Sequence, residues 1–277
     1  MGELRGPFKE LQQTLVQGEK GHYQVEYSII AGEDSVPLSA VIGDTLEIHF
    51  EDEKSCVHCG RRVKKLYQNG YCFPCVTTLA ECDLCIVKPH ECHYHLGTCR
   101  DESFADSHCM IPHYVYLADS SAVKVGLTRK GRQLKRWTDQ GATSAVLLGE
   151  TPTRKAAGEL EMFIARNLPD KTDWRKMLRD TGEADADLRQ IREDVVSGLD
   201  AEYEGYAFKQ PQSVVRFSYP RLPGFEPKLK SMSLDKEKSV KGTLCGIKGQ
   251  YLMFEEGVFN VRKHTGFHVS VTTSSSS

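Results

Sequence analysis

The stretch HYVYLADSSAVKVGLTR, residues 113–129, lies near the middle of the 277-residue chain and predicts two antiparallel strands. Tyr114–Ala118 and Val123–Thr128 are rich in β-branched and aromatic residues, and the polar residues between them are typical of a turn. Tyrosines stand on the first strand, and basic residues stand on the second. This hairpin is the first part of the predicted central domain, because two helices and a further strand are predicted directly after it.

After the hairpin we expect a helix at Arg132–Gln140, a strand at Ala145–Gly149 and a helix at Arg154–Leu168. Gly141 is typical of a helix end, and Pro152 of a helix start. The order strand, strand, helix, strand, helix therefore predicts a compact α+β domain over residues 113–180.

The other sections flank this domain. Residues 1–53 contain the alternating stretches HYQVEYSII and VPLSAVIGDTLEIHF, which predict strands, and residues 54–112 form a cysteine block. Residues 181–277 contain an acidic helix near Leu188–Leu199, a linker and strand-like segments. Because both terminal sections are short, we expect them to pair as one small β domain. The final TTSSSS is low in complexity and predicts disorder. The fold class is α+β.

Composition favours a soluble protein, since 39% of residues are apolar and 27% are charged. The sequence contains no apolar run of about 18 residues and no secretory signal, so we expect a cytoplasmic protein without membrane contact. The net charge of −2 averages over uneven segments. Residues 54–100 hold seven Lys and Arg against three Asp and Glu, and residues 121–140 hold six against one.

Nine of the ten cysteines lie between Cys56 and Cys109, and only Cys245 stands apart. In a cytosolic protein such a cluster favours metal over disulfides. Two Cys-x2-Cys pairs separated by twelve residues predict a structural zinc site with four thiolate ligands. These ligands are Cys56, Cys59, Cys72 and Cys75. Cys245 is typical of a small buried core residue.

A second zinc ion is expected in the rest of the block. The ligands chosen by proximity in the chain are Cys82, Cys85, Cys92 and Cys99. Cys109 and the histidines His90, His93, His95 and His108 remain open as alternatives. A redox-active pair at Cys82 and Cys85 is weaker, because no thioredoxin-like pattern surrounds it.

The first zinc hairpin contains GRRVKKLY, which places four cations beside an aromatic residue. That combination suits contacts to nucleic-acid phosphates with one stacking ring. The alternative interpretation is an ordinary solvated hairpin tip. Together with the basic hairpin and helix at 121–140, this segment favours DNA or RNA as the partner.

The central motifs resemble the GIY-YIG nuclease superfamily, in particular its phage- and virus-type branch. YVYL stands for the first motif, KVGLT for the second, LKRW for the helix arginine, and AGELEMFIARNL for the acidic helix. DKTDWRKML is similar to the close of that branch. The resemblance implies a nuclease fold and Mg²⁺-dependent cleavage of phosphodiesters.

The resemblance also implies roles for single residues. Tyr116, or its neighbour Tyr114 on the same strand face, would help to deprotonate water. Arg136, with Arg132 one helical turn away, would hold a phosphate, and Glu161 would bind Mg²⁺. Lys124 stands where the second motif has a tyrosine. A lysine neutralises a phosphate but does not position water, so this departure weakens the prediction of cleavage.

A wider resemblance covers nearly the whole chain. GYCFPC, CDLCI, CHYHLGTCR, RWTDQGA and GIKGQYL together resemble an uncharacterised family, domain of unknown function 2797, which implies no established activity. The sequence therefore predicts a zinc-containing, nucleic-acid-binding protein with a nuclease-like domain. The alternatives are a binding module that has lost cleavage and a zinc-stabilised scaffold for protein partners.

Overall fold

The computed structural model describes residues 3–19, 21–168, 173–180 and 186–275. The chain forms two compact units. The first contains Met1–Val16, Gln24–Thr77 and Tyr219–Ser277, and the second contains Gln17–Tyr23 and Thr78–Ser218. The division between Thr77 and Thr78 places the first four cysteines of the cysteine block in one unit and the remaining five in the other. Residues 170–172 of the motif DKTDWRKML lie outside the described residues.

The first unit contains a seven-stranded sheet, in the order β1-β14-β5-β11-β12-β13-β10. Most neighbours are antiparallel, but β10 and β13 run parallel, so the sheet is mixed. Its strands are β1 (Leu4–Pro7), β5 (Thr45–Lys54), β10 (Ser231–Met232), β11 (Ser239–Lys248), β12 (Tyr251–Phe254), β13 (Gly257–Asn260) and β14 (Phe267–Ser274).

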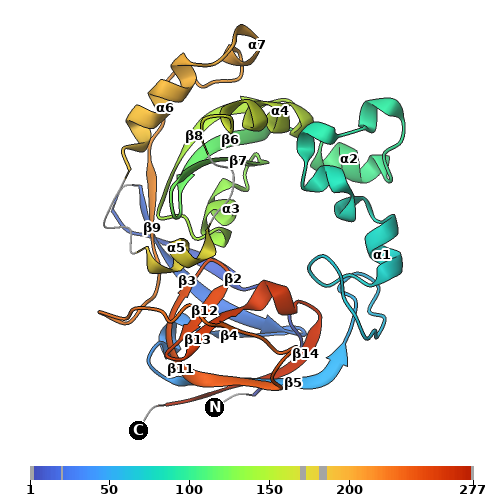
Figure 1. The fold of residues 1–277 in the computed structure, drawn as a ribbon, viewed down its shortest axis with the longest axis vertical. Coiled ribbons are helices and arrows are strands. Elements are labelled where there is room, and N and C mark those ends of the chain that lie inside the picture. The colour runs from blue at the N-terminus through green and yellow to red at the C-terminus, as the bar shows by residue number, and fades with distance from the viewer. Residues whose placement is uncertain (1–2, 20, 169–172, 181–185, 276–277) are drawn as a thin grey trace. The chain divides into compact units, whose positions relative to one another are not determined.

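This sheet joins the two ends of the chain, because β14 pairs with β1 on one side and with β5 on the other (Figure 1). The expected disorder of the TTSSSS tail is wrong for its first three residues. Thr272, Thr273 and Ser274 continue β14 and lie opposite Glu47, Leu46 and Thr45 of β5. The β-branched threonines suit a strand, and β5 supplies a partner that local composition does not reveal.

Three further strands and one α-helix lie wholly or mostly in the first unit. β2 (Gln12–Gln17) precedes β3 (His22–Ala31), which pairs antiparallel with β4 (Asp34–Pro37). The helix α1 (Phe73–Thr78) begins within the first cysteine group. Ile48, Phe254 and Phe259 are fully buried in the core of this unit. Cys245 is also buried, as the sequence predicts.

The second unit contains the predicted central order of elements. Its strands lie in the order β9-β8-β6-β7, with β7 at the end. They are β6 (His113–Asp119), β7 (Val123–Arg129), β8 (Ser144–Thr151) and β9 (Val215–Ser218), and their helices α3 (Gln133–Asp139) and α4 (Arg154–Ile164) follow β7 and β8. The predicted hairpin, both helices and the strand between them are thus confirmed, with ends that differ by a few residues.

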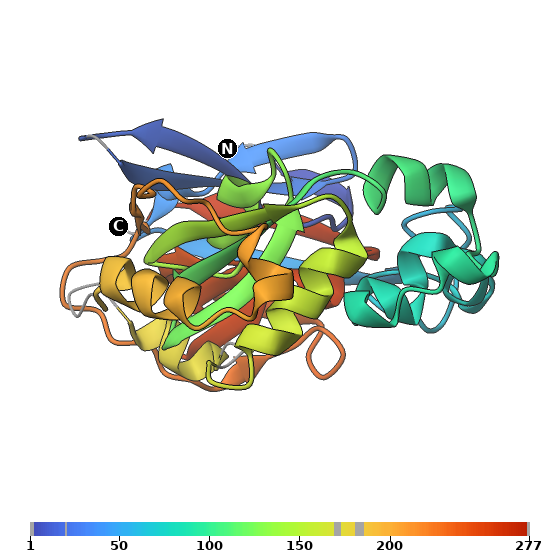
Figure 2. The same ribbon diagram turned by 90° about the horizontal axis from the view of Figure 1, so that it is seen from above.

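Helices cover this sheet on both faces. α4 and α6 (Leu188–Ser197) lie across one face, where Val115, Leu117 and Leu160 form the centre of the core (Figure 2). α3 lies on the opposite face, where Trp137 packs edge-on against Tyr116 with ring centroids 5.7 Å apart. Trp137 is only 2% exposed, so it is a core residue.

Three short helices complete the second unit: α2 (Glu102–His108), α5 (Trp174–Arg179) and α7 (Ala201–Glu204). Between Ala80 and Leu96 the chain consists of four 3₁₀ turns, namely Ala80–Cys82, Leu84–Ile86, Pro89–Glu91 and Tyr94–Leu96. The two mixed sheets and these helices confirm the α+β fold class.

Candidate functional site

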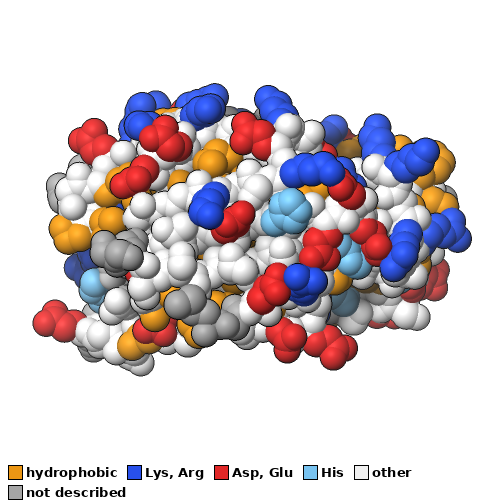
Figure 3. Space-filling view, turned by 90° about the horizontal axis from the view of Figure 1, so that it is seen from below, with side chains coloured by type: hydrophobic (Ala, Val, Ile, Leu, Met, Phe, Trp, Pro, Cys, Tyr) orange, Lys and Arg blue, Asp and Glu red, His pale blue; other side chains and the backbone are white. Residues whose placement is uncertain are grey.

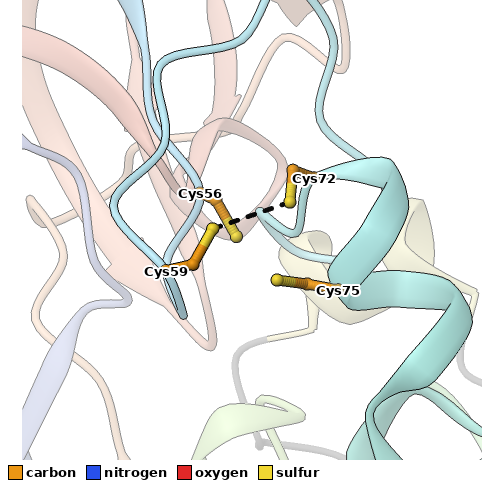
Figure 4. A group of neighbouring side chains, drawn as sticks. All are labelled: Cys56, Cys59, Cys72 and Cys75. Atoms are coloured by element: carbon orange, nitrogen blue, oxygen red, sulfur yellow. Dashed lines mark hydrogen bonds between the residues drawn. The ribbon is translucent and has the colours of Figure 1, made fainter.

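Four cysteines of the first unit converge on one point. Cys56 and Cys59 follow β5, while Cys72 and Cys75 lie at the start of α1 (Figure 4). All four sulfur atoms lie within 4.8 Å of one another, and the Sγ atoms of Cys59 and Cys72 are 3.7 Å apart. Zinc–thiolate bonds of about 2.3 Å in a tetrahedron place the sulfurs about 3.8 Å apart. The four thiols could therefore bind a zinc ion, as their spacing predicts.

The backbone around these thiols explains why glycines stand beside them. Gly60 has a φ of +69° and Gly70 a φ of +106°, which other residues rarely adopt. A Cβ on Gly70 would lie 2.7 Å from Val57 Cγ1. Burial tends to raise the pKa of the Cys56 thiol, but the backbone N–H groups of Cys59, Cys72 and His58 outweigh burial and lower it to about 6. The loop thus favours the thiolate of Cys56, the form that binds metal, whereas burial and the neighbouring thiols raise the pKa of Cys75.

The basic hairpin of this cysteine group is exposed. Arg61, Arg62, Lys64 and Lys65 are all exposed, and the Lys65 ammonium lies 4.8 Å from the centroid of the Tyr67 ring. The Tyr67 ring contacts that of Phe73, which is 62% exposed. Arg62 is paired with Glu53 at 2.7 Å. Cations and accessible rings therefore stand together on this hairpin, as its sequence predicts.

The second unit has a pocket of about 640 Å³ beside the edge strand β7. The end of β7, the helices α3 and α4, and the turns at 86–89 form its walls. Its charged lining consists of five basic residues and two acidic ones: Arg129, Arg132, Lys135, Arg136, Arg154, Asp139 and Glu161. Lys135 pairs with Asp139 at 3.2 Å. We call this site the basic pocket.

The basic pocket brings together three of the residues that the sequence singles out. Arg136 reaches it from α3, Arg132 reaches it from the position just before that helix, and Glu161 reaches it from α4. Helices on opposite faces of the sheet can share a pocket only where the sheet ends, and β7 is the last strand. Glu161 lies next to the buried stripe of Ala157, Leu160 and Ile164 on α4.

Tyr116 reaches toward the same edge from the neighbouring strand β6. It lies directly opposite Gly126 of β7, and its ring crosses β7 there. A Cβ on Gly126 would lie 2.6 Å from both Cζ and Oη of Tyr116. The glycine of the KVGLT motif therefore leaves the space that the phenol occupies.

The phenol of Tyr116 is fully buried, and its hydroxyl donates a hydrogen bond to Oε1 of Gln140 at 3.1 Å. Burial raises the pKa of this phenol, Arg136 lowers it in part, and Glu161 raises it further. A neutral, buried phenol is a poor base for water. Tyr116 thus lies behind the basic pocket, within electrostatic reach of both Arg136 and Glu161, and does not line it.

The structure places two further predicted residues away from the pocket lining. The Tyr114 ring packs edge-on against Phe208 at 6.0 Å, with Lys130 over its face at 5.9 Å. Lys124 is buried, with 3% of its surface exposed. Neither side chain is part of the basic pocket in the described structure.

Sequence reasoning missed two arginines of the pocket. Arg129 ends β7, and Arg154 is the first residue of α4. Burial lowers the pKa of Arg154, and the charges of Arg136 and Arg129 lower it further, although the nearby thiols Cys109 and Cys85 oppose this. The position of a basic residue at the start of α4 is the only local signal for Arg154. Its closeness to the other arginines depends on the tertiary fold.

The remaining cysteines lie in the second unit. Cys85, Cys92 and Cys99 line a small cavity together with Cys109, whereas Cys82 is buried outside its lining. Asp83, Cys85 and His93 also form a close group, with potential ligand atoms within 4.8 Å of one another. Of the four ligands predicted for the second zinc ion, Cys85, Cys92 and Cys99 therefore line one cavity, and Cys82 does not.

Charge is distributed differently elsewhere. On the face drawn in Figure 3, basic and acidic side chains are interspersed. Such mixing agrees with the net charge of −2 and contrasts with the five-to-two ratio in the basic pocket. Within the described ranges, no helix has both the length and the apolar character needed to cross a membrane.

Comparison with known proteins identifies one family. The family model described as Protein of unknown function (DUF2797) matches residues 43–269. No curated protein and no solved structure matches the chain. The matched region includes both cysteine groups and the basic pocket, and it covers well over half of the sequence. The chain therefore belongs to the family of proteins of unknown function DUF2797.

Proposed function

We propose that this protein binds nucleic acid and holds a backbone phosphate in the basic pocket of its second unit. The observation that carries the proposal is the convergence of five basic side chains on one concave site. Clustered arginines repel one another, and an anion relieves that repulsion. A phosphodiester is a suitable anion, because guanidinium groups donate paired hydrogen bonds to phosphate oxygens.

The exposed hairpin of the first unit supports the same class of partner. Its four cations and the rings of Tyr67 and Phe73 suit contacts with phosphates and unstacked bases. The zinc site beside it would act as a folding device, because four thiolates leave no position for water. DNA and RNA share this chemistry, and both belong in the test.

We further propose that the second unit is a GIY-YIG-like domain whose Glu161 binds Mg²⁺ near the phosphate held by Arg136 and Arg132. The motif order and the shared pocket support this role for Glu161. Tyr116 then acts as a positioning residue for Arg136, because its buried hydroxyl lacks access to water. Mg²⁺ would offset charge on the phosphate and activate water when bound.

A second candidate is a nucleic-acid-binding module without cleavage. The burial of Tyr116 and Lys124 favours it, because no phenol among the described residues lines the pocket to position water. A protein-interaction scaffold fits less well, since the most concentrated charge lies in a pocket instead of on a broad surface. The nuclease and the binding module differ only in whether the bound nucleic acid is cleaved.

The decisive experiment is a panel of labelled single-stranded, duplex and branched DNA and RNA, scored for both binding and cutting with Mg²⁺ or Mn²⁺. Arg136→Gln should weaken binding several-fold and reduce the salt dependence by about one phosphate contact. Arg189→Gln, which removes an exposed arginine on α6, is the matched control and should bind like the parent.

Glu161→Gln separates cleavage from binding. It should abolish metal-dependent cutting while the affinity for nucleic acid is kept. If the parent binds but cuts no substrate, the binding module is correct and the nuclease is not. If the parent binds no member of the panel, or if Arg136→Gln and Arg189→Gln behave alike, the basic pocket is not a phosphate site.

A further inference from the structure

Four cysteines of the second unit line one small cavity. Each follows or belongs to a different short element: Cys85 is in the 3₁₀ turn Leu84–Ile86, Cys92 follows Pro89–Glu91, Cys99 follows Tyr94–Leu96, and Cys109 follows α2. The cavity measures about 20 Å³, which is close to the space of one water-sized sphere. We infer that it holds a second zinc ion, bound by the thiolates of Cys85, Cys92, Cys99 and Cys109.

The segment around the cavity lacks a hydrophobic core of its own. Its large aliphatic residues Leu84, Val87 and Leu96 are 54%, 75% and 67% exposed. Its buried side chains are mostly small residues and thiols, such as Ala105 and Cys109. A chain built from single 3₁₀ turns with so little apolar burial needs another source of stability, and a structural zinc ion supplies it.

A buried arginine points to negative charge at the same place. The backbone N–H of Arg154 donates to the Cys109 carbonyl at 2.8 Å, and its Nη2 donates to the Ile86 carbonyl at 2.6 Å. Its buried Nε has no hydrogen-bond partner in the described part of the chain. A zinc ion with four thiolates carries a net charge of −2, which would stabilise this guanidinium.

The same metal would fix one wall of the basic pocket. Ile86 lines both the pocket and the cavity, and Pro89 lies against α4 at Gly158. A Cβ on Gly158 would lie 2.6 Å from Pro89 Cβ, so this turn and the helix are in close contact. Zinc binding would therefore fix the backbone carbonyls that hold Arg154, and this effect would not depend on which ligand the pocket binds. The inference does not depend on the proposed function.

Two other ligand sets fit less well. Cys82 is buried outside the cavity lining. Within the described residues, Asp83, Cys85 and His93 are the group of this unit whose ligand atoms lie within 4.8 Å of one another, so the four thiols would have to rotate into the cavity to bind one ion. Cys99 Sγ would then give up its contact with the Asp101 carbonyl at 3.4 Å. The side chains of Asp83 and His93 make other contacts. The Asp83 carboxylate pairs with Arg100 at 2.7 Å and accepts from the Cys85 backbone N–H at 3.2 Å. Nδ1 of His93 lies 2.8 Å from the Thr98 hydroxyl. We therefore assign Cys109, and not Cys82 or His93, to the metal.

The test is metal analysis of the full chain, purified under reducing conditions. The parent should contain two zinc ions per chain, and Cys109→Ser and Cys72→Ser should each contain one. Cys82→Ser and His93→Gln are the matched controls and should keep two. One zinc in the parent, two in Cys109→Ser, or one in either control would overturn the assignment.

A second measurement covers the case in which Cys109→Ser fails to fold. Replacing zinc by Co²⁺ in the parent should give two equivalents of metal with tetrahedral, thiolate-rich absorption. An absorption equal to one four-thiolate site, or a disulfide among the four thiols found by mass spectrometry, would contradict a second zinc centre. Loss of nucleic-acid binding is not a readout here, so failure of this proposal is distinguishable from failure of the proposed function.

Discussion

The contact between Gly126 and Tyr116 leads to a quantitative prediction. In Gly126→Ala, the added methyl would lie 2.6 Å from Cζ and Oη of Tyr116, where about 3.4 Å is the shortest comfortable contact. The phenol has little room to move. It is fully buried, it packs against Trp137, and it is hydrogen-bonded to Gln140. The extra methyl must therefore displace the ring.

The expected cost has two parts. Overpacking of a rigid core costs about 1–3 kcal/mol, and loss of the hydrogen bond to Gln140 adds about 1 kcal/mol. The free energy of unfolding of the second unit should thus fall by about 2–4 kcal/mol. In Tyr116→Leu, the atoms that clash are absent, so adding Gly126→Ala to that variant should cost much less.

Denaturant unfolding followed by tryptophan fluorescence measures this effect, because both tryptophans, Trp137 and Trp174, belong to the second unit. Gly205→Ala is the control, since a Cβ there meets nothing within 4 Å and the backbone is helical. It should change stability by less than about 1 kcal/mol. The reasoning is refuted if Gly126→Ala costs no more than this control, or costs the same with Leu at position 116.

Three further predictions concern other parts of the chain. Burial, with help from Arg154 and Arg129, lowers the pKa of His113 from 6.5 to about 4, so folding keeps this ring neutral where the unfolded chain would bind a proton. Stability should therefore fall by up to about 3 kcal/mol as the pH drops from 6.5 to 4, and His113→Gln should show a shallower fall in parallel denaturant titrations. Cys72→Ser, or a chelator, should unfold residues 56–75 and expose them to proteolysis, whereas Cys245→Ser should not; a parent with less than one zinc per chain would contradict the site. Gly158→Ala should destabilise the second unit by about 1–3 kcal/mol, because the added methyl group would clash with Pro89. This is expected although alanine favours helices. An increase in stability would show that Gly158 and Pro89 are not in close contact.

Local patterns predict the second unit well. The aromatic and β-branched residues of the hairpin, the helical spacing of Ala157, Leu160 and Ile164, and the burial of Trp137 all follow from residue type, periodicity and size. Such features depend on neighbours within a few residues, and the sequence displays these directly. The strand and helix types are therefore correct, and only their ends shift.

The pocket itself is less visible in the sequence. Arg129 and Arg154 meet Arg136 because β7 is an edge strand, and that position depends on how the strands are ordered. The catalytic role first expected for Tyr116 also depends on how deeply its side chain is buried, which the residue pattern of a strand does not reveal. Burial behind Gly126 removes from solvent a residue that was expected to contact water.

The place of β14 between β1 and β5 affects how the first unit can be made. During synthesis, Leu4–Pro7 emerges first but must wait for its neighbour until Phe267–Ser274 has left the ribosome. Pairings this distant in sequence form slowly, so β1 stays open to wrong partners until residues 267–274 have been made. A polypeptide cut short before residue 267 would lack the strand that joins its two ends.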